Sequence, residues 1–303
     1  MKFIDPKTDF AFKKIFGSQQ SHDILISFLN GMLYEGEPVI ADLDILNPYQ
    51  APKIAGVKQS YLDVKARLVT GEAVIIEMQV LNVEGFQKRI LYNAAKTYST
   101  QLQKGQDYPL LNPVVALTIT DFKMFADIDA VISRFVLKEK HHLIDYPIDD
   151  LELVFVELPK FQQPLEHLTT LTDKWIYFLQ HADDLSVVPP PMGSVAAIRQ
   201  AFAIANEANL TPDELDELEH QLIFIQDQRG AITLAAKQNR AAGRVEGRAE
   251  GRAEGRAEGW AEGRVGEKRD IARRLLDSME DVQIADVTGL SLANIQALRQ
   301  EKG

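Results

Sequence analysis

Two neighbouring segments alternate between polar and apolar residues, and they constrain the fold more than any other part of the chain. In residues 61–68, Asp63 lies on a polar face while leucine, valine and alanine occupy the opposite face. After a Thr-Gly turn signal, residues 73–80 alternate again, so Glu77 and Gln79 point the same way. The two segments predict an antiparallel hairpin, whose strands lie about 4.7–4.9 Å apart and bring the three polar side chains together.

The polar side chains of this hairpin suit a divalent cation. Asp63 and Glu77 would repel each other at this distance, and Glu77 lies within the apolar run 73–81, where an unpartnered charge is costly. Mg²⁺ relieves such repulsion, binds one or two carboxylates and keeps waters that can attack a phosphodiester. The alternative is that both acids are ordinary solvent-facing residues, as on many half-buried sheets. The spacing alone leaves both interpretations open.

Hydrophobic periodicity around the hairpin predicts an α/β fold. The elements expected up to residue 120 are a helix at 8–16, a helix at 22–33, a strand at 39–45, the two hairpin strands, a helix at 84–102 and a strand at 113–120. The last strand is apolar throughout, which is typical of a buried strand parallel to its neighbour. Further strands are expected at 135–137 and 151–158, and helices at 165–181, 195–206 and 213–228.

Several motifs in this order resemble the PD-(D/E)XK nuclease superfamily, and within it the Rpn family of recombination-promoting nucleases and putative transposases. They cover roughly the first 180 residues and comprise Asp5 to Gly17, Leu29-Asn30-Gly31, Leu62-Asp63-Val64, Ile76 to Gln79 and Val156 to Phe161. The resemblance implies a restriction-endonuclease-like α-β-β-β-α-β core, a mixed sheet flanked by helices, with a helical C-terminal region. It also implies that Asp63 and Glu77 are catalytic ligands of Mg²⁺ or another divalent cation.

The third catalytic position departs from the superfamily pattern. Gln79 stands where the wider superfamily usually has lysine, although glutamine looks normal for the Rpn branch. The change removes a fixed positive charge that could orient or acidify the attacking water. The sequence therefore supports metal binding more firmly than turnover.

Four further residues are candidates to support the site. Asp9 could approach the metal, as an acid from the first helix does in some superfamily members, or it could stabilise a helix dipole. Arg89 and Tyr92 could contact the DNA backbone, and Tyr92 could instead lie at the edge of the core. Lys65 belongs to the basic residues nearest the site in sequence, which could form a local basic rim: Lys13, Lys14, Lys58, Lys65, Arg67, Lys88, Arg89 and Lys96.

Composition agrees with a soluble enzyme of the cytoplasm. The 303-residue chain is 46% hydrophobic and has no cysteine, which excludes disulfides and thiolate metal sites and suits a reducing compartment. We expect neither secretion nor membrane insertion, because a signal-like segment and a run of about 18 apolar residues are both missing. The net charge of −11 argues mildly against indiscriminate DNA coating, and residues 1–229 carry 20 basic against 32 acidic side chains.

The C-terminal part contains a low-complexity tract at 243–266, built from repeats such as Gly-Arg-Ala-Glu. A helix there would stack Arg over Arg and Glu over Glu, and each glycine would cost about 1 kcal/mol against alanine. We interpret the tract as a spacer of variable length, which could be helical and self-associating. Residues 282–298 have the pattern helix, glycine turn, helix, which resembles a helix-turn-helix unit and equally suits a hairpin that packs on its own chain or on a second copy.

These observations predict four parts and one preferred function. The parts are a nuclease-like core at 1–160, a helical extension at 161–240, a spacer at 241–266 and terminal helices at 267–303. The preferred function is a Mg²⁺-dependent DNA endonuclease that could form homo-oligomers through its C-terminal helices. The alternative is a weak or inactive nuclease-fold protein that acts in DNA binding or assembly.

Overall fold

The computed structural model describes residues 2–50 and 60–302, so the predicted basic residue Lys58 lies outside the described part. The chain divides into two compact units, Met1–Arg229 and Gly230–Gly303. Of the described helices, none is both long enough and apolar enough to span a membrane.

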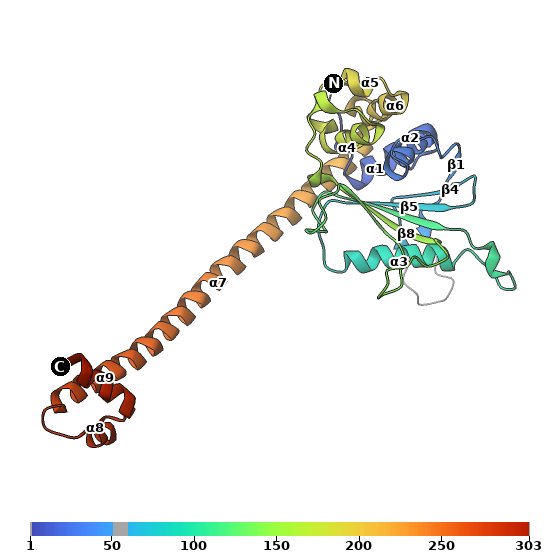
Figure 1. The fold of residues 1–303 in the computed structure, drawn as a ribbon. Coiled ribbons are helices and arrows are strands. Elements are labelled where there is room, and N and C mark those ends of the chain that lie inside the picture. The colour runs from blue at the N-terminus through green and yellow to red at the C-terminus, as the bar shows by residue number, and fades with distance from the viewer. Residues whose placement is uncertain (1, 51–59, 303) are drawn as a thin grey trace. The chain divides into compact units, whose positions relative to one another are not determined.

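The first unit is built on a six-stranded mixed sheet in the order β1-β4-β5-β6-β8-β7 (Figure 1). Its strands are β1 (Leu43–Leu46), β4 (Val64–Leu68), β5 (Ala73–Gln79), β6 (Val114–Thr120), β7 (Ile132–Phe135) and β8 (Leu151–Glu157). β5, β6 and β8 are parallel, and the other neighbours are antiparallel. The fully buried β6 confirms the parallel strand that its apolar sequence predicts.

Helices cover both faces of this sheet. α3 (Phe86–Ser99) lies on one face, and the other face carries the remaining main helices of the unit (Figure 1): α1 (Asp9–Phe16), α2 (His22–Leu33), α4 (Leu171–His181), α5 (Pro190–Gly193) and α6 (Ala196–Ala205). The order α1, α2, β1, β4, β5, α3, β6 confirms the predicted α-β-β-β-α-β core. β2 (Tyr49–Gln50) and β3 (Ser60–Tyr61) form a separate two-stranded sheet.

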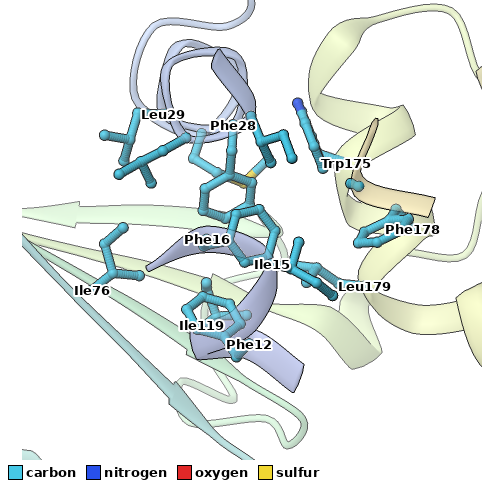
Figure 2. Close-up of a cluster of buried hydrophobic side chains, with 14 of the residues drawn as sticks. Phe12, Ile15, Phe16, Phe28, Leu29, Ile76, Ile119, Trp175, Phe178 and Leu179 are labelled. Carbon is cyan, nitrogen blue, oxygen red and sulfur yellow. The ribbon is translucent and has the colours of Figure 1, made fainter. Parts of the chain in front are cut away.

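α1 joins the hydrophobic core to the polar cleft described below. Thr8 begins the helix by accepting a hydrogen bond from the Ala11 backbone N, 3.3 Å away. Its buried side, including Phe12 and Phe16, packs between the sheet and the aromatic residues of α2 and α4 (Figure 2). The ring centroids of Phe16 and Trp175 are 5.7 Å apart. Because the apolar side of α1 is buried, the polar residues Asp9 and Lys13 lie on its other side.

Several predicted boundaries are wrong, for identifiable physical reasons. The run 61–68 is not one strand, because β3 ends at Tyr61 and β4 begins at Val64, with Asp63 in a bend between them. The helix expected at 165–181 begins only at Leu171, where Thr170 and Asp173 form a capping box. Smaller shifts affect the predicted strands at 39–45 and 135–137, which form as Leu43–Leu46 and Ile132–Phe135.

The helix expected at 213–228 is much longer than predicted. α7 runs from Pro212 to Leu275 and includes the whole repeat tract. Glycine is unfavourable in a helix, but arginine, alanine and glutamate are strong helix formers, and no proline interrupts the segment. Beyond α7, the pattern helix, glycine turn, helix is confirmed: α8 (Asp281–Thr288) ends at Gly289 in the left-handed region (φ 66°), and α9 (Leu292–Lys302) follows.

The second unit has a small hydrophobic core of its own. Ala272 comes from the end of α7, Leu276 from the turn directly after it, Ile284 from α8, and Ile295 and Leu298 from α9. These helices pack on their own chain, which is one of the alternatives that the sequence left open.

Candidate active site

One cleft of about 830 Å³ in the first unit brings together most of the predicted site residues. Three helices each present one face to it, since the lining residues recur at three- and four-residue spacings. The lining includes Asp9 and Lys13 of α1, Asp63, Glu77 to Gln79 of β5, Lys88, Arg89, Tyr92 and Asn93 of α3, and Gln221, Phe224 and Ile225 of α7. The sheet thus supplies the acids, and the helices surround them.

Asp63 is held by the backbone of the neighbouring strand. Its carboxylate accepts a hydrogen bond from the Met78 backbone N at 2.7 Å, and its side chain is only 13% exposed. Val64 pairs with Ile76 in the antiparallel register, and Asp63 lies one residue before Val64. Asp63 and Glu77 line the same cleft, although Asp63 lies just outside the regular strand.

Asp63 shares its surroundings with an acid and a base of α1. Lys13 Nζ lies 2.7 Å from Asp9 Oδ1 and 3.7 Å from Asp63 Oδ1. Burial, together with hydrogen bonding and repulsion by Asp9, raises the pKa of Asp63 to about 8, while the Met78 N–H and Lys13 oppose this shift. Burial lowers the pKa of Lys13, but the two carboxylates outweigh this effect and the net pKa is raised. Two carboxyl groups thus share one ammonium group.

Glu77 and Gln79 are bridged by one arginine of α3. The Nη2 atom of Arg89 lies 2.7 Å from Glu77 Oε1 and 2.6 Å from Gln79 Oε1. The Gln79 amide is oriented, because its Nε2 donates to the Leu81 carbonyl at 2.7 Å. Burial raises the pKa of Glu77, against the opposing effects of Arg89 and a hydrogen bond with Asn93.

The donor set fits a cation that is completed by water or substrate. Within residues 2–50 and 60–302, no three histidine, cysteine, aspartate or glutamate side chains are grouped so as to hold a metal ion. The cleft offers instead two carboxylates with raised pKa values, Asp63 and Glu77, and the amide oxygen of Gln79. Mg²⁺ is commonly bound through one or two carboxylates together with waters and phosphate oxygens. The residues present therefore suit Mg²⁺ and do not form an all-protein cage.

The supporting residues predicted from sequence differ in their placement. Asp9, Arg89 and Tyr92 line the cleft, whereas Lys65 is not among its lining residues. Lys65 is half-buried on β4, and burial followed by repulsion from Arg67 lowers its pKa. The sequence predicts Lys13 only as part of a general basic rim, and it predicts no site role for Asn93 or the α7 residues. The spacing of Asn93 from Arg89 on α3 was the available signal, because residues four apart share a helix face.

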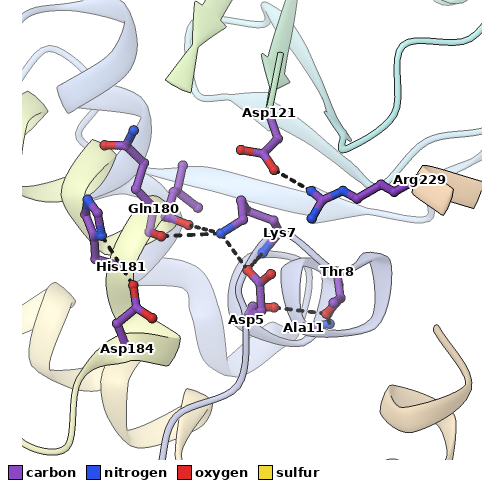
Figure 3. A network of polar contacts seen from close by, with 10 residues as sticks. Asp5, Lys7, Thr8, Ala11, Asp121, Gln180, His181, Asp184 and Arg229 are labelled. Atoms are coloured by element: carbon purple, nitrogen blue, oxygen red, sulfur yellow. Dashed lines mark hydrogen bonds and ion pairs between the residues drawn. The ribbon is translucent and has the colours of Figure 1, made fainter. Parts of the chain in front are cut away.

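A second polar network ties the end of β6 to α7 (Figure 3). Asp121 Oδ2 lies 2.8 Å from Arg229 Nη2, and the Asp121 backbone N donates to the Gln79 carbonyl at 3.0 Å. Burial raises the pKa of Asp121, while Lys7 and Arg229 oppose the shift. Lys7 in turn lies 3.1 Å from Asp5 Oδ1 and donates to the carbonyls of Leu179 and Gln180. This network fixes the first part of α7 beside the strand that carries Glu77.

Comparison with family models agrees with this architecture. The model of the PD-(D/E)XK nuclease family transposases matches residues 6–235. No significant match was found among curated proteins or among solved structures. The matched range contains every residue that lines the cleft and ends before the repeat tract. The chain therefore belongs to the PD-(D/E)XK nuclease family transposases, and its mixed sheet with flanking helices is the nuclease-like fold of that family.

Proposed function

We propose that the protein is a Mg²⁺-dependent DNA endonuclease whose site is the cleft around Asp63 and Glu77. The observation that carries this proposal is the meeting of two largely buried acids from adjacent chain segments, both with raised pKa values, in one open cleft. Perturbed acids in a cleft are typical of functional sites. DNA as the substrate and the cytoplasm as the compartment follow from family membership and from the sequence, and they belong to the same proposal.

Each residue has a distinct role in this proposal. Asp63 and Glu77 would hold the cation, which supplies charge stabilisation and an activated water when it is bound. Gln79 has no proton to transfer, and its oriented amide positions a water or a phosphate oxygen. Lys13 and Arg89 provide positive charge near the two acids, and they compensate for the lysine that Gln79 replaces.

The alternative function also has a structural observation in its favour. Arg89 pairs with Glu77, and Lys13 pairs with Asp9 and lies near Asp63, so the acids have partners without a cation. A protein that binds DNA through Arg89 and Lys88 without cutting it would need no further group. The two functions differ in one measurable property, which is cleavage that depends on a divalent ion.

Cleavage of supercoiled plasmid tests the proposal. We expect the full-length protein to nick plasmid in Mg²⁺ and to stop when EDTA is added. Asp63→Asn and Glu77→Gln, which preserve side-chain size, should each remove this activity. Asp44→Asn, at an exposed acid of β1 outside the cleft, is the matched control and should cleave normally. Cleavage by both site variants, or none by the unaltered protein with any divalent ion, would reject the nuclease function.

A further inference from the structure

The wall of the cleft formed by α7 carries two apolar side chains, Phe224 and Ile225, beside Gln221. Phe224 lines the cleft with its residue 59% exposed, and Ile225 and Gln221 line it beside Phe224. Leu218, six residues before Phe224 on the same helix, is buried in the core. Phe224 is absent from the hydrophobic clusters of the described residues. Packing in a core therefore does not explain why an aromatic residue stands at this position.

This wall is fixed to the nuclease-like core at three points. Lys14 of α1 forms an ion pair with Glu214. The backbone N of Phe10 donates to Gln221 Oε1 at 2.9 Å. Arg229 pairs with Asp121 at 2.8 Å (Figure 3). Because these contacts lie before, beside and after Phe224 on α7, the ring is held at the cleft by the fold of the first unit.

The α3 wall of the cleft carries charge and a second aromatic ring. Lys88 and Arg89 are exposed cations, and Tyr92 follows one turn later with 39% of its surface exposed. Proteins that bind single-stranded nucleic acid combine cations that follow the phosphate backbone with aromatic side chains on which bases stack. Lys88, Arg89, Tyr92 and Phe224 supply both components around the acids Asp63 and Glu77.

We infer that the cleft takes DNA with unpaired nucleotides at the cleavage site, whose bases stack on Phe224 and Tyr92 while Lys88 and Arg89 contact the backbone. This inference rests on the proposed function and specifies its substrate. A base inside a duplex already stacks on its neighbours, so a protein ring can reach its face only where the strand is open. Phe224 has no hydrogen-bonding group, and stacking on it discriminates little between bases. The preference is therefore for strand state and not for sequence.

A binding experiment tests this inference separately from catalysis. Full-length protein carrying Asp63→Asn, in Ca²⁺, is titrated against a fluorescent single-stranded oligonucleotide and against a blunt duplex that contains the same strand. We expect Phe224→Ala to weaken single-strand binding about tenfold and duplex binding by less than about twofold. Phe224→Trp should retain single-strand binding. Ile223→Ala is the control, because Ile223 is 50% exposed on the same helix and does not line the cleft.

The outcomes separate this inference from the proposed function. Equal weakening of both ligands by Phe224→Ala, or no weakening in a variant whose circular dichroism and melting are normal, would overturn the stacking role even if the plasmid is cleaved. A selective loss of single-strand binding supports the role even if no divalent ion supports cleavage. Two single-stranded oligonucleotides of different composition should bind within about threefold of each other, and a strong base preference would contradict a stacking wall.

Discussion

The nuclease-like core and the repeat tract are both well-defined secondary structure, but their side chains have opposite surroundings. In the core, a Cβ added to Gly31 would lie 3.2 Å from Trp175 Cδ1. In the tract, a Cβ added to Gly247, Gly251 or Gly255 would meet no atom within 4 Å. Close packing constrains the first set of residues, whereas only helix propensity and charge constrain the second. Substituting the same type of residue should therefore change the free energy of unfolding by different amounts in the two regions.

The two tryptophans of the chain give the largest expected contrast. Trp175 is fully buried among Phe16, Phe28 and Phe178, whereas Trp260 in the tract is 77% exposed. Trp175→Ala should lower the free energy of unfolding by about 3–5 kcal/mol, because it opens a cavity in an aromatic core. Trp260→Ala should change it by less than about 0.5 kcal/mol. Urea denaturation followed by circular dichroism measures both, and a similar loss in the two variants would contradict the contrast.

Substitutions of acidic residues should also affect the cleavage rate strongly in the core and weakly in the tract. Asp63→Asn should reduce Mg²⁺-dependent cleavage about a hundredfold or more, because the cation loses one of its two carboxylates. Glu254→Gln removes a carboxyl group from the exposed tract and should leave the rate within about twofold. Initial rates on supercoiled plasmid compare the two variants. A strong effect of Glu254→Gln would place part of the catalytic apparatus in the tract.

The pH dependence of stability sharpens the contrast between buried and exposed acids. The pKa of Asp63 is about 8 in the folded protein, against about 3.9 in an unfolded chain. The folded, metal-free protein therefore binds more protons between these values, and its free energy of unfolding falls as the pH rises through that window. Asp63→Asn should remove this loss and stabilise the protein at pH 8 by at least about 1 kcal/mol.

Thermal melting in EDTA at pH 5 and pH 8 measures this effect. The gain of Asp63→Asn over the unaltered protein should be larger at pH 8 than at pH 5, and Glu254→Gln serves as the exposed control. A gain that does not depend on pH would show that Asp63 does not carry the titration.

Glycine substitution gives the smallest expected effects, of opposite sign in the two regions. Gly251→Ala should stabilise the tract helix by about 1 kcal/mol, since alanine favours the helix and no neighbour is displaced. Gly31→Ala should destabilise the core, because the added methyl group must displace Trp175. Amide hydrogen exchange reports the tract, and urea denaturation reports the core. Stabilisation by Gly31→Ala would show that the core has room at α2.

Much of the core was predictable because its elements are locally encoded. The period-two alternation around Asp63 and Glu77 predicts two adjacent strands, and the apolar run at 113–120 predicts a buried parallel strand. Glycine at position 230 predicts the end of a helix near Gln228, and this prediction is wrong, because Gly230 is itself helical and α7 continues. The alternation in sequence predicts that Lys65 lies on the same face of the sheet as Asp63, yet Lys65 does not line the cleft. Alternation predicts which face a side chain occupies, but not where along the strand the cleft lies.

The sequence alone was enough for the order of the core helices and strands, the neighbouring segments that carry Asp63 and Glu77, and the family resemblance, because these depend on periodicity and short motifs. Tertiary structure was needed for the surroundings of those acids. Lys13, Asn93 and Phe224 lie on three helices far apart in the chain, and only packing and ion pairs such as Arg229 with Asp121 bring them to one cleft. Long-range contacts of this kind leave no local pattern, so the electrostatics of the site and its α7 wall emerge only from the folded chain.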